Sequence, residues 1–138
     1  MACYLWRYGL IDTPDFVAEQ GHWMRRPGLG FVHVEGARDA IMALKAGAAH
    51  GGRQIFTEHR DLFRRPLTIT ELDRFDAIVI DPPRAGAEVQ CAELAKSQVK
   101  KIVAISCNPL TLARDLAILT AGGYRIDMVT PIDQFLWS

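Results

Sequence analysis

A cysteine stands between an apolar run and a helical one in the second half of the chain. Ile102–Ile105 has the character of a buried strand, and a helix is predicted to begin near Pro109. Asn108 is a favoured N-cap residue, as proline is at the first helical position. Cys107 therefore lies at a helix N-terminus, where the dipole and free N–H groups favour a thiolate able to attack an electron-poor ring carbon. The alternative is a small packed side chain, and position alone does not decide between them.

A second candidate is the stretch Asp81–Gly86, which follows another apolar strand and contains consecutive prolines. Proline cannot extend a strand ladder, so the chain must leave the sheet here in a stiff turn. The turn places the Asp81 carboxylate and the Pro82 backbone at the edge of the sheet, where they can hold a flat base. The alternative is a rigid loop in which Asp81 caps nearby amides.

Two further carboxylates follow predicted strands. Glu35 closes the first one, and an acid at that place in a doubly wound sheet accepts hydrogen bonds from the ribose hydroxyls of a nucleoside cofactor. Asp61 follows the second strand, where it can read an adenine amino group. Taken singly, Glu35 is better explained as a cap of the next helix, and Asp61 as a solvated loop residue.

Composition limits the other possibilities. Sixteen basic and sixteen acidic residues give zero net charge, which neither supports nor excludes RNA binding. The three cysteines form no CxxC pair and the four histidines lack metal spacing, so we expect thiols in a reducing cytoplasm and no metal site. No apolar run is long enough to span a bilayer, and no secretory signal is visible, so we expect no membrane partner.

The elements that position these residues alternate regularly along the chain. Helices are predicted at 37–50, 88–98 and 110–120, and strands at 31–35, 54–57, 75–80, 101–106, 124–130 and from 132, with a polar connection at 61–74. This alternation predicts an α/β fold with a parallel sheet and right-handed crossovers. Ligands bind beyond the carboxyl ends of such strands, where Glu35, Asp81 and Cys107 all fall.

Two of these stretches together resemble a known family. Ile80–Gly86, followed about twenty residues later by Ser106–Leu116, is similar to the RNA 5-methyluridine (uracil-C5) methyltransferases, which act on tRNA or 23S rRNA. The ending Pro131–Phe135 also resembles the family's approach to its final motif. The resemblance covers residues 31–138. It implies a Rossmann-like class I methyltransferase fold, a mainly parallel sheet, and S-adenosyl-L-methionine as the cofactor.

The resemblance also implies a mechanism. Cys107 would attack C6 of the uracil, C5 would take the methyl group from the cofactor, and a general base would then remove the C5 proton. Asp81 would hold the uracil or polarise its ring. The target base would have to be flipped out or already unpaired. The remaining site residues that the resemblance implies are Glu35, Asp61 and Asp81 toward the cofactor, and Pro82, Arg84, Asn108 and Gln134 toward the substrate.

The chain departs from the family pattern in three places. The glycine-rich cofactor loop, Asp-x-x-x-Gly-x-Gly, is expected just before residue 31, and nothing in residues 1–30 matches it. The chain stops at Ser138, before the His-x-Glu motif that holds the general base. The N-terminal RNA-binding module of many members is also absent.

These departures define the expected organisation. Residues 1–30 are predicted to be an atypical N-terminal segment, and residues 31–138 a partial catalytic domain. The sheet is expected to be incomplete, with the gap filled by residues 3–8 as a substitute strand or covered by a partner chain. An open edge would promote self-association. We expect weak or no activity from this chain. The alternatives are an inactive fragment or binding module, and a methyltransferase-like fold with another substrate.

Overall fold

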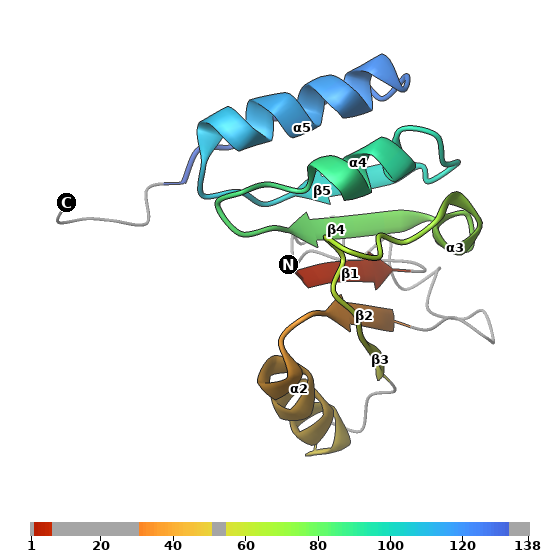
Figure 1. Ribbon diagram of the computed structural model, residues 1–138, viewed down its shortest axis with the longest axis vertical. Helices are drawn as coiled ribbons and strands as arrows, with labels where there is room; N and C mark the ends of the chain where they lie inside the picture. Colours follow the sequence, from red (N-terminus) through yellow and green to blue (C-terminus); the bar gives the residue numbers. More distant parts are fainter. Residues whose placement is uncertain (1, 7–30, 51–54, 133–138) are drawn as a thin grey trace, which may run out of the picture.

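The chain folds into a five-stranded sheet flanked by helices (Figure 1). The structure is a computed structural model, and it describes residues 2–6, 31–50 and 55–132. The strands run in the order β3-β2-β1-β4-β5. Their bounds are β1 Ala2–Trp6, β2 Phe31–Glu35, β3 Ile55–His59, β4 Ala77–Asp81 and β5 Lys101–Ala104. The helices are α2 Arg38–His50, α3 Ile69–Leu72, α4 Glu88–Leu94 and α5 Pro109–Ala121.

The sheet is parallel on both sides of an antiparallel centre. β2 pairs with β3 and β4 pairs with β5 in parallel, which confirms the α/β class and the predicted direction of these strands. The expected substitute strand is present as β1, but it runs antiparallel to both β2 and β4. It therefore begins at the edge where its neighbours end, with Ala2 opposite both Glu35 and Asp81. The described strands thus do not form a complete Rossmann-like sheet.

Local sequence accounts for the helix that follows β5. The Asn108 side chain caps α5 by accepting a hydrogen bond from the Leu110 amide at 3.1 Å, and Pro109 occupies the first helical position. Both features agree with the sequence prediction. The helix ends at Ala121, and Gly123 follows with φ +98°.

The apolar core lies mainly at the β4–β5 end of the sheet. α4 and α5 lie beside β4 and β5 in Figure 1, whereas α2 lies at the other end, beside β2 and β3. Ile41 is the buried residue of α2. The core cluster consists of Val34, Leu62, Leu67, Leu72, Ile78, Ile80, Ala87, Cys91, Leu94, Val99 and Leu119.

One predicted strand is wrong. Residues 124–130 have no regular structure, and residues 125–132 are all exposed. Tyr124 anchors the start of this segment by donating a hydrogen bond from its hydroxyl to the Val99 carbonyl at 2.7 Å. A strand requires a ladder partner as well as apolar residues, and β5 gives this segment none among the described residues. The strand predicted from residue 132 lies almost wholly outside the described residues.

Two predicted elements are shorter than expected. The helix predicted at 88–98 ends at Leu94, and the Ser97 hydroxyl donates to the Leu94 carbonyl at 2.8 Å. The strand predicted at 101–106 ends at Ala104. The polar connection at 61–74 contains the short helix α3, whose N-cap Thr68 and Glu71 form a capping box. None of the described helices combines the length and apolarity that a membrane span requires.

Candidate functional site

Cys107 lies in the turn between β5 and α5, and its side chain is exposed. The flanking residues fix this turn: Ser106 Oγ accepts from the Asn108 amide at 3.2 Å and donates to the Asn108 carbonyl at 3.1 Å. Cys91 differs, because burial within α4 raises the pKa of its thiol to about 12. The packing alternative therefore describes Cys91 and not Cys107. An exposed thiol beside a helix N-terminus is accessible to a substrate.

The stretch 81–86 makes the stiff turn that its prolines predicted. Pro82 is buried, and the Gly86 amide donates to the Pro83 carbonyl at 2.8 Å. The Asp81 side chain is exposed, and within the described residues it makes no hydrogen bond. The capping alternative for Asp81 thus has no support. Its carboxylate is available at the sheet edge.

The turn with Cys107 and the loop after β4 are held together. Asn108 Nδ2 donates to the Arg84 carbonyl at 3.0 Å, and Thr111 Oγ1 donates to the same oxygen at 3.1 Å. The Ile105 amide donates to the Ile80 carbonyl at 2.9 Å, which joins the two strand ends. The structure therefore places the Asp81 loop and the Cys107 turn at one edge of the sheet. The Arg84 side chain is exposed, and no acidic side chain among the described residues pairs with it.

The two carboxylates expected near a cofactor act as local caps. Glu35 is buried, and its Oε1 accepts from the Ala37 amide at 2.8 Å. Asp61 Oδ1 accepts from the Phe63 amide at 3.0 Å and from the Arg64 amide at 3.4 Å. The Glu35 contact is the capping alternative considered from the sequence, whereas Asp61 was considered only as a solvated loop residue and is an exposed cap. The strand ends nevertheless adjoin, because the amide of Arg60 donates to the Glu35 carbonyl at 2.9 Å.

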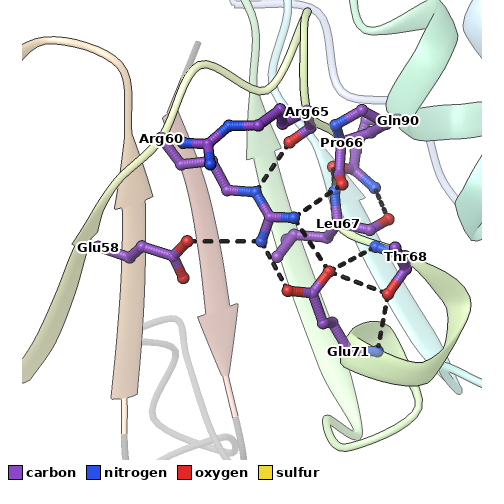
Figure 2. A network of polar contacts seen from close by, with 8 residues as sticks. All are labelled: Glu58, Arg60, Arg65, Pro66, Leu67, Thr68, Glu71 and Gln90. Atoms are coloured by element: carbon purple, nitrogen blue, oxygen red, sulfur yellow. Dashed lines mark hydrogen bonds and ion pairs between the residues drawn. The ribbon is translucent and has the colours of Figure 1, made fainter.

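A partly buried arginine, missed by the sequence analysis, fixes the segment that follows Asp61, and Figure 2 shows its contacts. The Arg60 side chain is 11% exposed. Its guanidinium donates to Glu71 at 2.7 and 3.1 Å, to the Arg65 carbonyl at 2.9 Å and to the Pro66 carbonyl at 3.1 Å. The hydrogen bond from Arg60 is the main reason why the pKa of Glu71 is lowered to about 2, and it raises the pKa of Arg60. The Thr-x-x-Glu capping signal was readable, but the partner of Glu71 was not.

A glutamine of α4 completes this support. The buried Gln90 amide accepts from the Leu67 amide at 2.8 Å and donates to the Leu67 carbonyl at 3.1 Å (Figure 2). It satisfies both backbone groups of a buried loop residue, which would otherwise be costly. A polar residue in the middle of an amphipathic helix gives no sequence signal for such a role. The loop is thereby attached to the β4–β5 end of the molecule.

The described residues fit the expected cofactor only in part. Glu35 and Asp61 lie beyond adjacent parallel strands, as a nucleoside site in this class of sheet requires. The methionine end would need a loop that leaves a central strand at the same edge. β1 instead runs away from that edge, starting at Ala2 between Glu35 and Asp81. The described residues therefore supply no place for the methionine end.

Two other expectations from the sequence concern Gln134 and the lack of a metal site. Gln134, expected to line the substrate pocket, lies outside the described residues. No group of three histidine, cysteine, aspartate or glutamate side chains that could hold a metal ion occurs in the described segments. The described site thus consists of the Cys107 turn, the Asp81 loop and the strand ends that carry Glu35 and Asp61.

Comparison with known proteins agrees with the sequence resemblance. A family profile described as tRNA (Uracil-5-)-methyltransferase matches residues 43–138. An uncharacterized RNA methyltransferase of Agrobacterium fabrum is 63% identical over 118 residues, 83% of this chain and 28% of that protein. One from Rhizobium meliloti is 64% identical over 107 residues, 76% of this chain and 26% of that protein.

A relative that is named for the uridine it modifies is more distant. The 23S rRNA (uracil(1939)-C(5))-methyltransferase of Shewanella frigidimarina is 40% identical over 105 residues, 75% of this chain and 23% of that protein. The chain thus spans about a quarter of the length of these relatives. No solved structure matches the chain significantly.

Proposed function

Since the chain belongs to the tRNA (uracil-5-)-methyltransferase family, we propose that it carries the substrate half of an RNA uracil-C5 methyltransferase, with Cys107 as the nucleophile. The observation that carries this proposal is the attachment of the Cys107 turn to the Asp81 loop through the Arg84 carbonyl. An exposed thiol and an exposed carboxylate at one sheet edge can engage two parts of one flat ring.

The chemistry follows from the electron demand of uracil. The Cys107 thiolate adds to C6, and the C5–C6 π electrons move toward the C4 carbonyl, which makes C5 an enolate carbon. The Asp81 carboxylate accepts a hydrogen bond from the ring N3–H and so holds the uracil edge. The exposed Arg84 guanidinium is available to a phosphate or to the developing oxyanion.

Other residues of the proposed site act indirectly. Both ends of the Asn108 side-chain amide are engaged, with Leu110 and with the Arg84 carbonyl, so Asn108 positions the loop. Pro82 is a buried residue of the loop itself, and its fixed φ stiffens the loop. We also propose that Gln134 lines the same pocket, as the family resemblance implies.

S-adenosyl-L-methionine, when bound, would supply the methyl group to C5 and leave as S-adenosyl-L-homocysteine. Removal of the C5 proton by a base would then expel the Cys107 thiolate. Glu35 would hold its ribose and Asp61 would lie near its adenine, once their present capping contacts rearrange. We expect weak or no methyl transfer from these 138 residues, because β1 runs antiparallel at the centre of the sheet, where the methionine end would need a parallel strand.

We propose an unpaired or flipped-out uridine of tRNA or rRNA as the substrate, because a stacked base cannot reach Cys107. The family is named for tRNA and one relative for 23S rRNA, which supports these two classes of RNA. A cytoplasmic location follows from this substrate. Self-association would use the outer strands β3 or β5, since β1 closes the centre of the sheet.

The test is a covalent complex with RNA that contains 5-fluorouridine, resolved on a denaturing gel. The wild-type chain and Cys91→Ala are expected to form it, and Cys107→Ser is not. Cys91 is the matched control because its thiol is buried. Lack of a complex with the wild-type chain, or an undiminished complex with Cys107→Ser, would contradict the proposal.

One observation favours a second candidate, a binding module without catalysis: the antiparallel β1 stands where the family places its cofactor strand. Calorimetry with S-adenosyl-L-methionine discriminates between the two. Micromolar binding would exclude the inactive reading, whereas no binding and no adduct would favour it. An adduct with RNA would exclude a methyltransferase-like chain that acts on a small molecule.

A further inference from the structure

Two adjacent charged residues of α5, Arg114 and Asp115, contact the loop 81–87. They lie further along the helix than Asn108 and Thr111, which contact the same loop. Asp115 is buried, with its side chain 5% exposed. Its Oδ2 accepts a hydrogen bond from the Ala87 amide at 2.6 Å. Its Oδ1 accepts from Arg114 Nε at 3.0 Å and from Arg114 Nη2 at 2.8 Å. Arg114 Nη2 also donates to the Ala85 carbonyl at 3.0 Å.

This pairing is unusual for a helix. Side chains at consecutive helical positions point about 100° apart and do not normally face each other. Arg114 and Asp115 meet because both turn toward the same stretch of loop backbone. The loop is therefore held at three successive points, the carbonyls of Arg84 and Ala85 and the amide of Ala87.

Gly86 permits this close approach. It has φ +80°, a conformation that side chains of L-residues rarely adopt. A Cβ atom at this position would lie 2.5 Å from Arg114 Nη2, 2.7 Å from Asp115 Oδ2 and 2.9 Å from Thr111 Cβ. The loop backbone thus rests directly on the side chains of α5. A larger residue would push the loop away from the helix.

Burying a carboxylate is unfavourable unless its oxygens are satisfied, and an apolar residue usually serves packing at least as well. Asp115 is satisfied by the loop and by Arg114, whose Nη1 lies 3.1 Å from Glu88 Oε2 at the exposed side. We propose that Asp115, together with Arg114, is a positioning residue that fixes the Asp81 loop relative to Cys107. This inference rests on the proposed function. It assigns to the two residues the alignment of the uracil-holding carboxylate with the attacking thiol.

Asp115→Asn is the informative variant. The asparagine oxygen still accepts from the Ala87 amide, but the charge that holds Arg114 is lost. Glu88→Gln is the matched control, because it removes the other ion pair of Arg114 and leaves the loop contacts intact. Thr111→Val removes a hydroxyl of α5 that donates to the Arg84 carbonyl of the same loop, and it serves as a second variant where Asp115→Asn does not fold.

Each variant is measured in two ways below its unfolding temperature. Iodoacetamide alkylation of Cys107, followed by mass spectrometry from pH 6 to 10, reports the reactivity of the thiol alone. Adduct formation with saturating 5-fluorouridine RNA reports its alignment with the base. We expect Asp115→Asn to keep the alkylation profile and to form the adduct about tenfold more slowly or worse. Glu88→Gln should match the wild type, and Thr111→Val should show a smaller loss in the same direction.

The outcomes distinguish the positioning role of Asp115 from the proposed function of the chain. Equal adduct rates for the wild type and Asp115→Asn would overturn the positioning role alone. A parallel fall in alkylation and adduct rates would also overturn it, because that result indicates a general loosening. An absent adduct with the wild-type chain would overturn the proposed function, and the positioning role with it.

Discussion

At the β4–β5 end of the sheet, α4 and α5 cover a buried core, whereas at the β2–β3 end α2 buries a single residue (Figure 1). The first end carries the Asp81 loop and the Cys107 turn, joined by several hydrogen bonds. The second carries Glu35 and Asp61, which cap their own surroundings. Under the proposed function, this difference means that the substrate side is organised in advance, and that the described residues of the cofactor side supply no place for the methionine end.

Core packing should show the largest contrast. Leu94→Ala removes a fully buried side chain of α4 from the core cluster, and we expect a loss of about 2–5 kcal/mol in the free energy of unfolding. Met42→Ala shortens a side chain of α2, at the β2–β3 end, that is 61% exposed, and should cost less than about 0.5 kcal/mol. Urea denaturation measures both. Equal effects would remove the basis of the contrast.

Arg60 should come next, because it attaches the end of β3 to α3 (Figure 2). Arg60→Ala leaves Glu71 and two loop carbonyls without their donor, with an expected loss of about 1–3 kcal/mol. Lysine should restore less than half of this, since it cannot form the same fork of hydrogen bonds. Arg64→Ala is the control, because its side chain is 87% exposed. A loss for Arg60→Ala no greater than that of the control would show that the two ends are independent.

The pH dependence of Glu71 should be the smallest effect. Its pKa is lowered from 4.5 to about 2 in the folded chain, mainly by the hydrogen bond from Arg60. A carboxyl group with a lowered folded pKa stabilises the fold above pH 4.5, and this contribution is lost as the pH falls toward 2. Since the side chain is 38% exposed, screening reduces the effect to about 1 kcal/mol. Glu71→Gln should flatten this part of the stability profile, and an unchanged slope would refute the assignment.

Sequence reasoning succeeded where local signals decide the outcome. Asn108 and Pro109 marked the start of α5, and the apolar runs marked β2, β4 and β5. It failed for residues 124–130, because an apolar pattern does not reveal whether a ladder partner is available. The antiparallel direction of β1 was equally unreadable, since side-chain alternation is the same in either direction.

The site shows the same division. Cys107 and the Asp81 loop were readable, because residue type, spacing and strand ends together specify them. Asp115 was not, since a charged pair within a helix is usually solvated, and only the contact with a loop 28 residues earlier in the chain reveals its burial. Contacts between residues far apart in sequence have no local signal.

Intact mass spectrometry of the chain with 5-fluorouridine RNA, with and without S-adenosyl-L-methionine, tests the central claim most directly. The substrate side is predicted to work without the cofactor side. We therefore expect a covalent complex whose mass is the sum of chain and RNA, under both conditions, and none with Cys107→Ser. A complex that is quantitatively one methyl group heavier when the cofactor is present would contradict the incomplete cofactor side, and the absence of any complex would contradict the organised substrate side.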